Sequence, residues 1–214
     1  MLEICQHAHP QGFRLQGDEE MLPYARESLD LVISNLSLHW VNDLPGCFAQ
    51  IRQSLKPDGL FMATIFGGDS LHELRHSLMQ AEVNLKGGVS PHISPFVDIK
   101  DAGSLLQRAG FALPVVDRDC ITVTYADMFR LMKELSGMGE GNALQKRFRG
   151  LSSRTVMMEA ARIYQDKFAD ERGRIKARFE IITLMGWAPH ESQQKPLKPG
   201  SGKVNLGEVL GKKA

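Results

Sequence analysis

Cysteine is scarce in this sequence of 214 residues, which contains only Cys5, Cys47 and Cys120. The three are far apart in the chain, form no Cys-x-x-Cys pair and are odd in number. This distribution excludes a disulfide framework and favours a reducing compartment.

An excess of charge is also lacking, because 26 Lys and Arg residues against 25 Asp and Glu residues give a net charge of +1. This balance argues against electrostatic capture of nucleic acid or of an acidic substrate. No apolar run approaches the length of a membrane span. The first residues are not Arg-rich, and Glu3 and Gln6 interrupt any apolar core. We therefore expect neither a signal peptide nor a transit peptide within this chain.

What the sequence does contain is an alternation of strand and helix patterns. Leu29–Ser34 (LDLVIS) and Leu60–Phe66 (LFMATIF) are short apolar runs, typical of buried strands. Between them, Asp43–Leu55 predicts a helix capped by Asp43, and Lys56–Gly59 (KPDG) predicts a turn. A helical crossover of this kind implies two parallel strands. The apolar face of this helix comprises Leu44, Cys47, Phe48, Ile51 and Leu55.

Further elements follow up to about residue 187. Ser70 and Glu73 predict a capping box for a helix that ends at Lys86. We expect one partial α/β domain over residues 1–187 and a disordered tail, rich in Pro, Gly, Ser and Lys, over residues 188–214. The apolar stripe of the capped helix comprises Leu71, Leu74, Leu78, Ala81 and Leu85. The other predicted elements are Asp101–Ala109 (helix), Val115–Tyr125 (strand), helices around Phe129 and Met157, and Phe179–Leu184 (strand).

The segments beside the predicted strands resemble the class I S-adenosylmethionine-dependent methyltransferases. These segments are Gly17–Tyr24 (GDEEMLPY), Leu29–Asn35, His39-Trp40 and Leu55–Gly59. Within that superfamily, Ser34–Trp40 (SNLSLHW) is similar to the branch of the malonyl-carrier-protein O-methyltransferases. Phe66–Asp69 (FGGD), Ser90–Phe96 (SPHISPF), Ala109–Phe111 and Met185–Trp187 are similar to mitochondrial arginine hydroxylases that assist the assembly of respiratory complex I.

The resemblance implies a Rossmann-like methyltransferase fold with extra C-terminal helices. It also implies S-adenosylmethionine as the cofactor, a complex I subunit as the protein substrate, and hydroxylation of an arginine. The implied location is the matrix side of the mitochondrial inner membrane, in peripheral association with it. Two alternatives stay open: an O-methyltransferase of the malonyl-carrier-protein type, and a non-catalytic assembly chaperone.

By the same resemblance, Asp18 accepts a hydrogen bond from the adenine amino group and Glu19 lies beside it. Asn35 and Leu36 line the cofactor from the end of their strand, since ligands of such sheets bind at the carboxyl ends of the strands.

Three residues are candidates for the reacting centre. His39 and Trp40 would shape its floor, and His92, between two prolines, could reach a substrate from a lid. The alternative interpretations are a helix-flanking histidine for His39, core packing for Trp40 and an ordinary loop position for His92. The alternative for the cofactor candidate Asp18 is a turn residue.

The start of the chain departs from the family pattern. The first strand, the GxGxG loop and the acidic residue that ends the second strand would precede Gly17, where only Met1–Gln16 are available. A strand–helix–strand unit takes about 30 residues or more. We therefore expect an N-terminally truncated fold and weak or absent binding of S-adenosylmethionine by this chain.

Three motifs suggest chemistry but have simpler explanations. His72–His76 matches HExxH, yet no third zinc ligand lies at a plausible spacing, so we expect no metal site. Gly137–Gly141 spells GxGxG but follows a helix rather than a strand, and predicts a turn. The basic cluster is typical of a solvated face and comprises Lys146, Arg147, Arg149 and Arg154.

Overall fold

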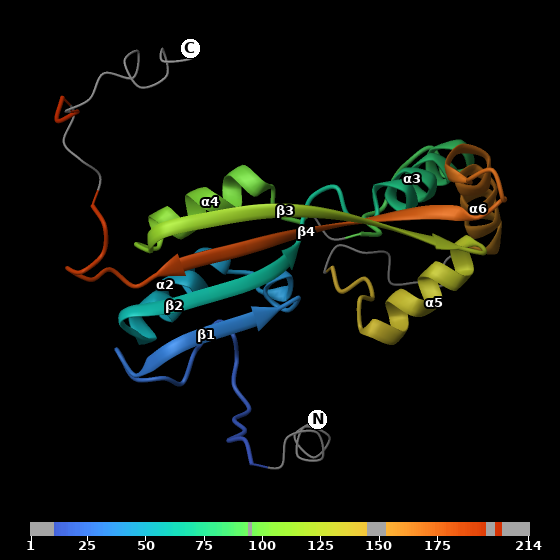
Figure 1. The fold of residues 1–214 in the computed structure, drawn as a ribbon. Coiled ribbons are helices and arrows are strands. Elements are labelled where there is room, and N and C mark those ends of the chain that lie inside the picture. Colours follow the sequence, from blue (N-terminus) through green and yellow to red (C-terminus); the bar gives the residue numbers. More distant parts are fainter. Residues whose placement is uncertain (1–10, 94–95, 145–152, 196–199, 203–214) are drawn as a thin grey trace, which may run out of the picture.

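The computed structural model describes residues 11–93, 96–144, 153–195 and 200–202 (Figure 1). Within them, four strands form one sheet in the order β1-β2-β4-β3. β1 and β2 are parallel, and β4 is antiparallel to both β2 and β3. The prediction of an α/β fold is confirmed. The strands are β1 (Leu29–Asn35), β2 (Leu55–Phe66), β3 (Ala112–Tyr125) and β4 (Ile175–Trp187).

The predicted crossover between the first two strands is present as α2 (Leu44–Ser54). Asp43 caps it by accepting a hydrogen bond from the Gly46 N–H, and the predicted apolar face is buried. The Lys56–Gly59 segment, predicted as a turn, instead belongs to β2. The reason is a register irregularity: Leu29 and Leu31 pair with Leu55 and Leu60, so the extra residues bulge, with Asp58 at a φ of 64°.

Helix α3 (His72–Lys86) begins without the predicted capping box, because its N-cap is Leu71 and no side chain caps it. Ser70 Oγ instead donates to the Glu180 carbonyl and accepts from the Glu180 N–H, and the Glu73 carboxylate accepts from the Arg178 N–H. β2 pairs with β4 no further than Ile181, so the preceding backbone of β4 needs other partners on that side. Leu85, predicted in the apolar stripe, is exposed because the last turn of α3 extends beyond the core.

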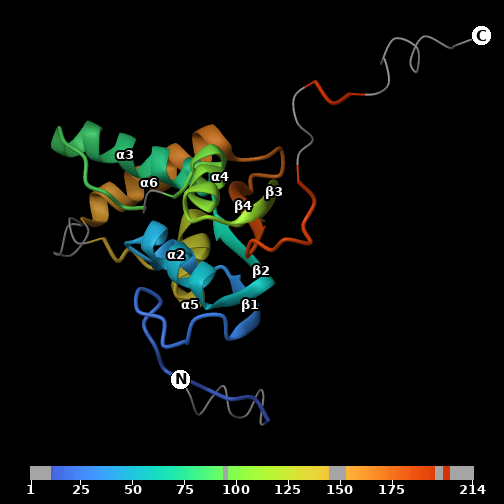
Figure 2. The same cartoon turned by 90° about the vertical axis from the view of Figure 1, so that its left-hand side faces the viewer.

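The core consists of two clusters on opposite faces of β4. Ile175, Ala177 and Phe179 join one cluster, whereas Ile182 and Leu184 join the other, as the alternation of side chains along a strand requires. The first cluster is covered by α3, α5 (Met128–Met138) and α6 (Arg154–Phe168). The second is covered by α2 and α4 (Ile99–Arg108). Figure 1 shows the two groups of helices toward opposite ends of the sheet, and Figure 2 views the molecule from the end at which α2 and α4 lie.

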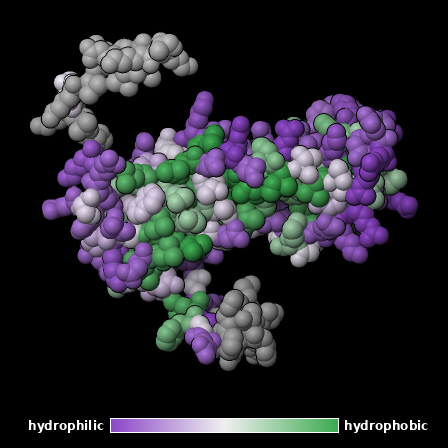
Figure 3. Space-filling view, viewed as in Figure 1, coloured by the Kyte–Doolittle hydropathy of each residue, from purple (hydrophilic) through white to green (hydrophobic). Residues whose placement is uncertain are grey.

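Beyond the helices that cover the first cluster, part of the same face of the sheet has no covering helix in the described part of the chain. Ile33, Met62, Met185 and Val115 are partners in register, so they form a row across all four strands. Ile33 is 64% exposed and Val115 is 50% exposed. Figure 3 shows apolar surface over the strands in the same view as Figure 1.

The first residue of the region predicted as a tail is packed against the sheet. Ala188 is buried, and its backbone exchanges hydrogen bonds with Gly59 and Asp58. Residues 196–199 and 203–214 lie outside the described residues.

Candidate functional site

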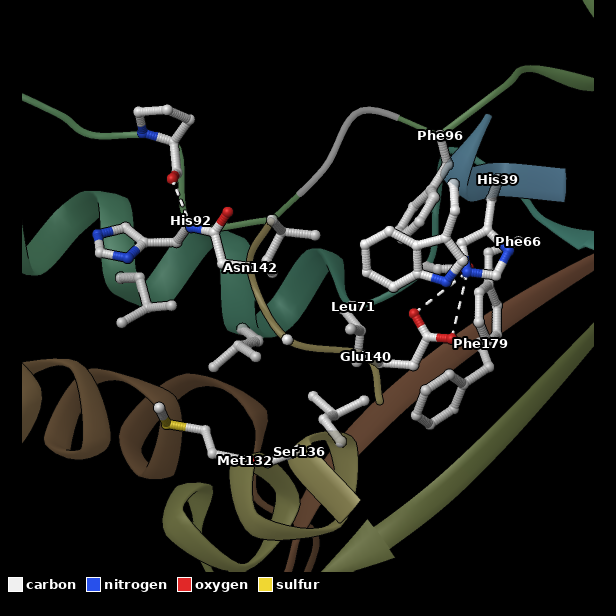
Figure 4. A pocket seen from close by; sticks show the side chains of 18 of the residues that line it. His39, Phe66, Leu71, His92, Phe96, Met132, Ser136, Glu140, Asn142 and Phe179 are labelled. Carbon is white, nitrogen blue, oxygen red and sulfur yellow. Dashed lines mark hydrogen bonds and ion pairs between the residues drawn. The ribbon is translucent and has the colours of Figure 1, made fainter. Parts of the chain in front are cut away.

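A cavity of about 390 Å³ lies between α3, α5 and the loop that follows α3 (Figure 4). One end is closed by η1, the short 3-10 helix Leu38–Trp40 that follows β1. All three residues predicted for the reacting centre, His39, Trp40 and His92, line this cavity. Most of the remaining wall is apolar and includes Phe66, Leu71, Leu74, Leu78, Met132, Leu135 and Phe179.

His39 is held at the closed end by an acid and by aromatic rings. Its side chain is 4% exposed, and its Nε2 lies 3.2 Å from both carboxylate oxygens of Glu140. Its ring centroid lies 5.2 Å from that of Trp40, 5.0 Å from that of Phe66 and 6.1 Å from that of Phe96. His39 is therefore a buried residue of the cavity wall, within η1 itself.

The chain segment after α5 closes the cavity from another side. Gly139 ends α5 with a φ of 88°, and the next residue, Glu140, reaches His39 across a sequence separation of 101 residues. Asn142 Nδ2 donates to the Pro91 carbonyl at 2.9 Å, which ties this segment to the loop after α3 (Figure 4). The predicted turn over Gly137–Gly141 thus begins within the last residues of α5 and carries an acid into the cavity wall.

A second histidine–carboxylate pair involves the predicted lid residue. His92 Nε2 lies 3.2 Å from Glu82 Oε1, and the Glu82 side chain is only 2% exposed. Burial raises the pKa of Glu82, but hydrogen bonds from the Ser90 N–H and hydroxyl and the nearness of His92 outweigh it and lower that pKa. Glu82 therefore stays ionised and anchors the loop that carries His92.

The predicted cofactor residues fall beside a different hollow of about 270 Å³ near the carboxyl end of β1. Glu19 and Asn35 line it, whereas Asp18 and Leu36 are not among its lining residues. Asp18 accepts a hydrogen bond from the Glu20 N–H in an exposed turn. Leu36 has a φ of 49°, and its N–H donates to the Thr64 carbonyl.

The two hollows lie on either side of η1. Ser37 and Leu38 line the hollow near β1, and the next two residues, His39 and Trp40, line the larger cavity. A group bound beside β1 and a group bound in the cavity would thus be separated by one short turn of chain.

Sequence reasoning also missed the carboxylate of Glu20, which fixes the segment before β1 onto α2. It accepts from the Asn42 N–H at 2.6 Å and from Asn42 Nδ2 at 3.0 Å, and these bonds lower the pKa of Glu20. Burial and the nearby carboxylates of Glu19, Glu20 and Asp43 raise the pKa of Cys47, which lines the hollow, to about 11. The thiol of Cys47 is therefore protonated at neutral pH.

The HExxH residues lie outside the cavity. Glu73 is bonded to the backbone of β4, and His76 Nε2 lies 3.0 Å from Lys167 Nζ. The rings of His72 and His76 both contact Phe168 edge-on. Among the described residues, no group of three or more His, Cys, Asp or Glu side chains could hold a metal ion. Of the basic cluster, only Arg154 lies within the described residues, at the start of α6.

Comparison with known proteins shows that the sequence is similar to that of methyltransferase-related proteins. The model of the methyltransferase domain family matches residues 1–63. The chain is 50% identical to the mitochondrial arginine hydroxylase NDUFAF5 of Homo sapiens over 192 residues. These residues make up 90% of this chain and 55% of that protein. The arginine hydroxylase NDUFAF5 of Dictyostelium discoideum is 51% identical over 186 residues, or 86% of this chain and 42% of that protein.

A malonyl-[acyl-carrier protein] O-methyltransferase of Xylella fastidiosa is more distant. It is 40% identical over 176 residues, which cover 82% of this chain and 57% of that protein. The chain thus spans about half the length of the curated relatives that it matches.

The fold of the chain is similar to that of solved structures. A proposed methyltransferase from Bacillus halodurans superposes with a TM-score of 0.55 at 16% identity, over 85% of this chain and 79% of that chain. The YcgJ protein from Bacillus subtilis superposes with a TM-score of 0.56 at 14% identity, over 88% of this chain and 76% of that chain. At such identities the likeness concerns the arrangement of strands and helices.

Proposed function

We propose that this chain belongs to the class I S-adenosylmethionine-dependent methyltransferase superfamily and that it acts in the hydroxylation of an arginine of a respiratory complex I subunit. The observation that carries the proposal is its identity of about one half to mitochondrial arginine hydroxylases over most of its length. The malonyl-carrier-protein methyltransferases share fewer of its residues. Assembly of complex I is the process that this modification would serve.

The mitochondrion is the location that follows from the same relatives. We place the protein at the matrix side of the inner membrane, in peripheral association with it. No helix among the described residues is long and apolar enough to cross a membrane.

The hollow near β1 suits part of S-adenosylmethionine. Asn35 and Glu19 supply an amide and a carboxylate, of which the carboxylate is a suitable acceptor for an exocyclic amine, and Leu22, Val32 and Leu38 supply apolar surface. We assign Glu19 and Asn35 to the hollow itself, and Asp18 and Leu36 to its approaches. When bound, the cofactor supplies a cationic sulfonium with a transferable methyl group.

Binding of S-adenosylmethionine to the 214-residue chain should be weak. The glycine-rich stretch at Gly137–Gly141 follows a helix and belongs to the cavity wall rather than to the hollow near β1. Each polar contact that a strand-to-helix glycine loop would add is worth about 1–3 kcal/mol, and about 1.4 kcal/mol is a factor of ten in affinity. Titration calorimetry on the purified chain should give a dissociation constant well above the micromolar range, and micromolar binding would refute this expectation.

The residues of the chain itself bind and shield the substrate. Glu140 and Asn142 hold the segment after α5 across the cavity, and η1 lies between cavity and hollow. Hydroxylation replaces a C–H bond by C–O and O–H bonds. With dioxygen as the oxidant it also consumes two electrons and two protons and releases the second oxygen atom as water, and these co-reactants must be supplied from outside these residues. The apolar walls would limit the access of water to the reacting carbon.

Mass spectrometry of complex I subunits and of acids bound to the acyl carrier protein, from cells with and without the protein, separates the three candidate functions. The proposal predicts that one arginine loses the mass of one oxygen atom when the protein is absent. Loss of a methyl group from a carrier-bound acid would favour the O-methyltransferase. An assembly defect with no change at any arginine would favour a chaperone that uses the fold only to hold a partner.

A further inference from the structure

The closed end of the cavity combines one carboxylate with several aromatic faces. The His39 imidazole lies near both oxygens of Glu140 on one side and contacts the rings of Trp40, Phe66 and Phe96 (Figure 4). The Glu140 side chain is 16% exposed, so its charge is largely withdrawn from water. A carboxylate in such a setting needs a donor partner.

The charges of the wall decide which ligands fit. Among the described residues that line the cavity there is a carboxylate, Glu140, and no Lys or Arg. The buried carboxylate of Glu82 stands behind His92 elsewhere on the wall. An acidic ligand would meet no cationic partner on these residues, whereas a cationic ligand would meet Glu140 and the rings.

A flat, delocalised cation suits this end better than an ammonium group. A guanidinium presents parallel N–H donors that match the two oxygens of a carboxylate, and it stacks on aromatic faces. The His39 imidazole already occupies such a position, because its Nε2 is equidistant from both Glu140 oxygens and its ring lies among the aromatic rings.

We propose that Glu140, with the rings of Trp40, Phe66 and Phe96, binds the guanidinium group of the arginine substrate, which replaces the His39 imidazole at the carboxylate. The proposal deepens the proposed function and rests on it for the identity of the substrate. The site itself rests on the geometry of the cavity. His39, on the three-residue helix η1, is the group that must turn aside.

The test measures the affinity of the 214-residue chain for a short acetylated peptide that contains a single arginine. Titration calorimetry gives the dissociation constant. The same peptide with citrulline, which is neutral and nearly isosteric, or with lysine is the ligand control. We expect the arginine peptide to bind at least about tenfold more tightly than either control, and Glu140→Gln to weaken its binding by at least about tenfold. Glu171→Gln removes the same charge from an exposed turn and should leave binding unchanged.

A His39 variant provides an independent readout. If the guanidinium replaces the imidazole, His39→Ala should bind the arginine peptide more tightly than the wild-type chain, because no imidazole then competes for Glu140. Thermal melts of each variant exclude loss of fold as the cause. Equal affinity of the wild-type chain and Glu140→Gln, or no saturable binding by the wild-type chain, would overturn the proposal, as would an equal or lower affinity in a folded His39→Ala variant.

The outcome is separable from that of the proposed function, since binding requires no turnover. Glu140-dependent binding of arginine without any gain of oxygen in the subunits would keep the site and refute the hydroxylation. A gain of oxygen that is undiminished, with an unchanged KM, in the Glu140→Gln variant would keep the hydroxylation and refute the site.

Discussion

Gly67, the first residue after β2, illustrates how one missing side chain shapes the structure. A Cβ at this position would lie 2.5 Å from Glu180 Oε2. Glu180 Oε2 in turn accepts from the Asp69 N–H at 2.8 Å, so it cannot move without losing that bond. We predict that Gly67→Ala lowers the free energy of unfolding by about 1–3 kcal/mol.

Urea denaturation followed by circular dichroism measures this change. Gly88→Ala is the matched control, because nothing lies within 4 Å of the Cβ it would add. Equal midpoints for the two variants would contradict the close approach of Gly67 to Glu180.

Two cysteines should differ sharply in reactivity. Cys47 is buried with its pKa raised to about 11, first by burial and then by Glu19, whereas Cys120 is exposed on β3. Since the thiolate is the nucleophile, iodoacetamide at neutral pH should alkylate Cys120 and leave Cys47 unmodified. Peptide mapping by mass spectrometry reads each site separately. Modification of both at similar rates in the folded chain would show that Cys47 is accessible.

Among single residues, sequence reasoning identified three that line the cavity but missed its carboxylate, Glu140. His39, Trp40 and His92 stand out in the sequence because they follow a predicted strand or lie in a proline-bounded loop. Glu140 lies in a glycine-rich stretch that predicts only a turn, and its contact to His39 spans 101 residues. A charged residue inside such a stretch was the one available signal.

Among the elements, α3 is joined to β4 by side chains that bond to the backbone of β4 where no neighbouring strand pairs with it. Glu73 is buried, and its carboxylate accepts from the Arg178 N–H beyond the end of β2. We predict that Glu73→Ala lowers the free energy of unfolding by about 1–3 kcal/mol, because it leaves a partly buried backbone donor unsatisfied.

Glu159→Ala is the control for this prediction, since it removes a carboxylate that is paired with Arg162 on the helix surface. Exposed pairs of this kind contribute little to stability. If thermal melts show equal losses for the two variants, the bond to the backbone of β4 has no special role.

The elements themselves were largely predictable, and the exceptions share a cause. α2 followed from its cap and its apolar face, which are local signals. The capping box at Ser70 and Glu73 has an equally good local pattern, yet both side chains bond to β4 more than a hundred residues away. The two side chains bond to the unpaired backbone of a distant strand instead of capping the helix. The sequence near α3 gives no indication of that strand.

At the scale of the whole molecule, the uncovered sheet face determines how the chain should behave by itself. Ile33, Met62, Met185 and Val115 form one apolar row across the four strands. We predict that the 214-residue chain self-associates at micromolar concentration, because large exposed apolar patches are rare on monomers. Analytical ultracentrifugation should show a species larger than a monomer.

Ile33→Thr with Val115→Thr should reduce this association, since both side chains are at least half exposed and their replacement keeps the β-branched shape. Met79→Thr is the control, because Met79 is an exposed apolar residue on α3, away from that row. A monodisperse monomer for the wild-type chain would contradict the prediction.

The central claim is that this cavity receives an arginine that becomes hydroxylated. The most direct measurement is the fraction of hydroxylated arginine in complex I subunits, by mass spectrometry, in cells that lack the protein and are supplied with a variant. We predict that the wild-type protein and Glu171→Gln restore the added oxygen, and that Glu140→Gln, present at the same level, does not. Full restoration by Glu140→Gln, or an unchanged arginine mass in cells without the protein, would contradict the account.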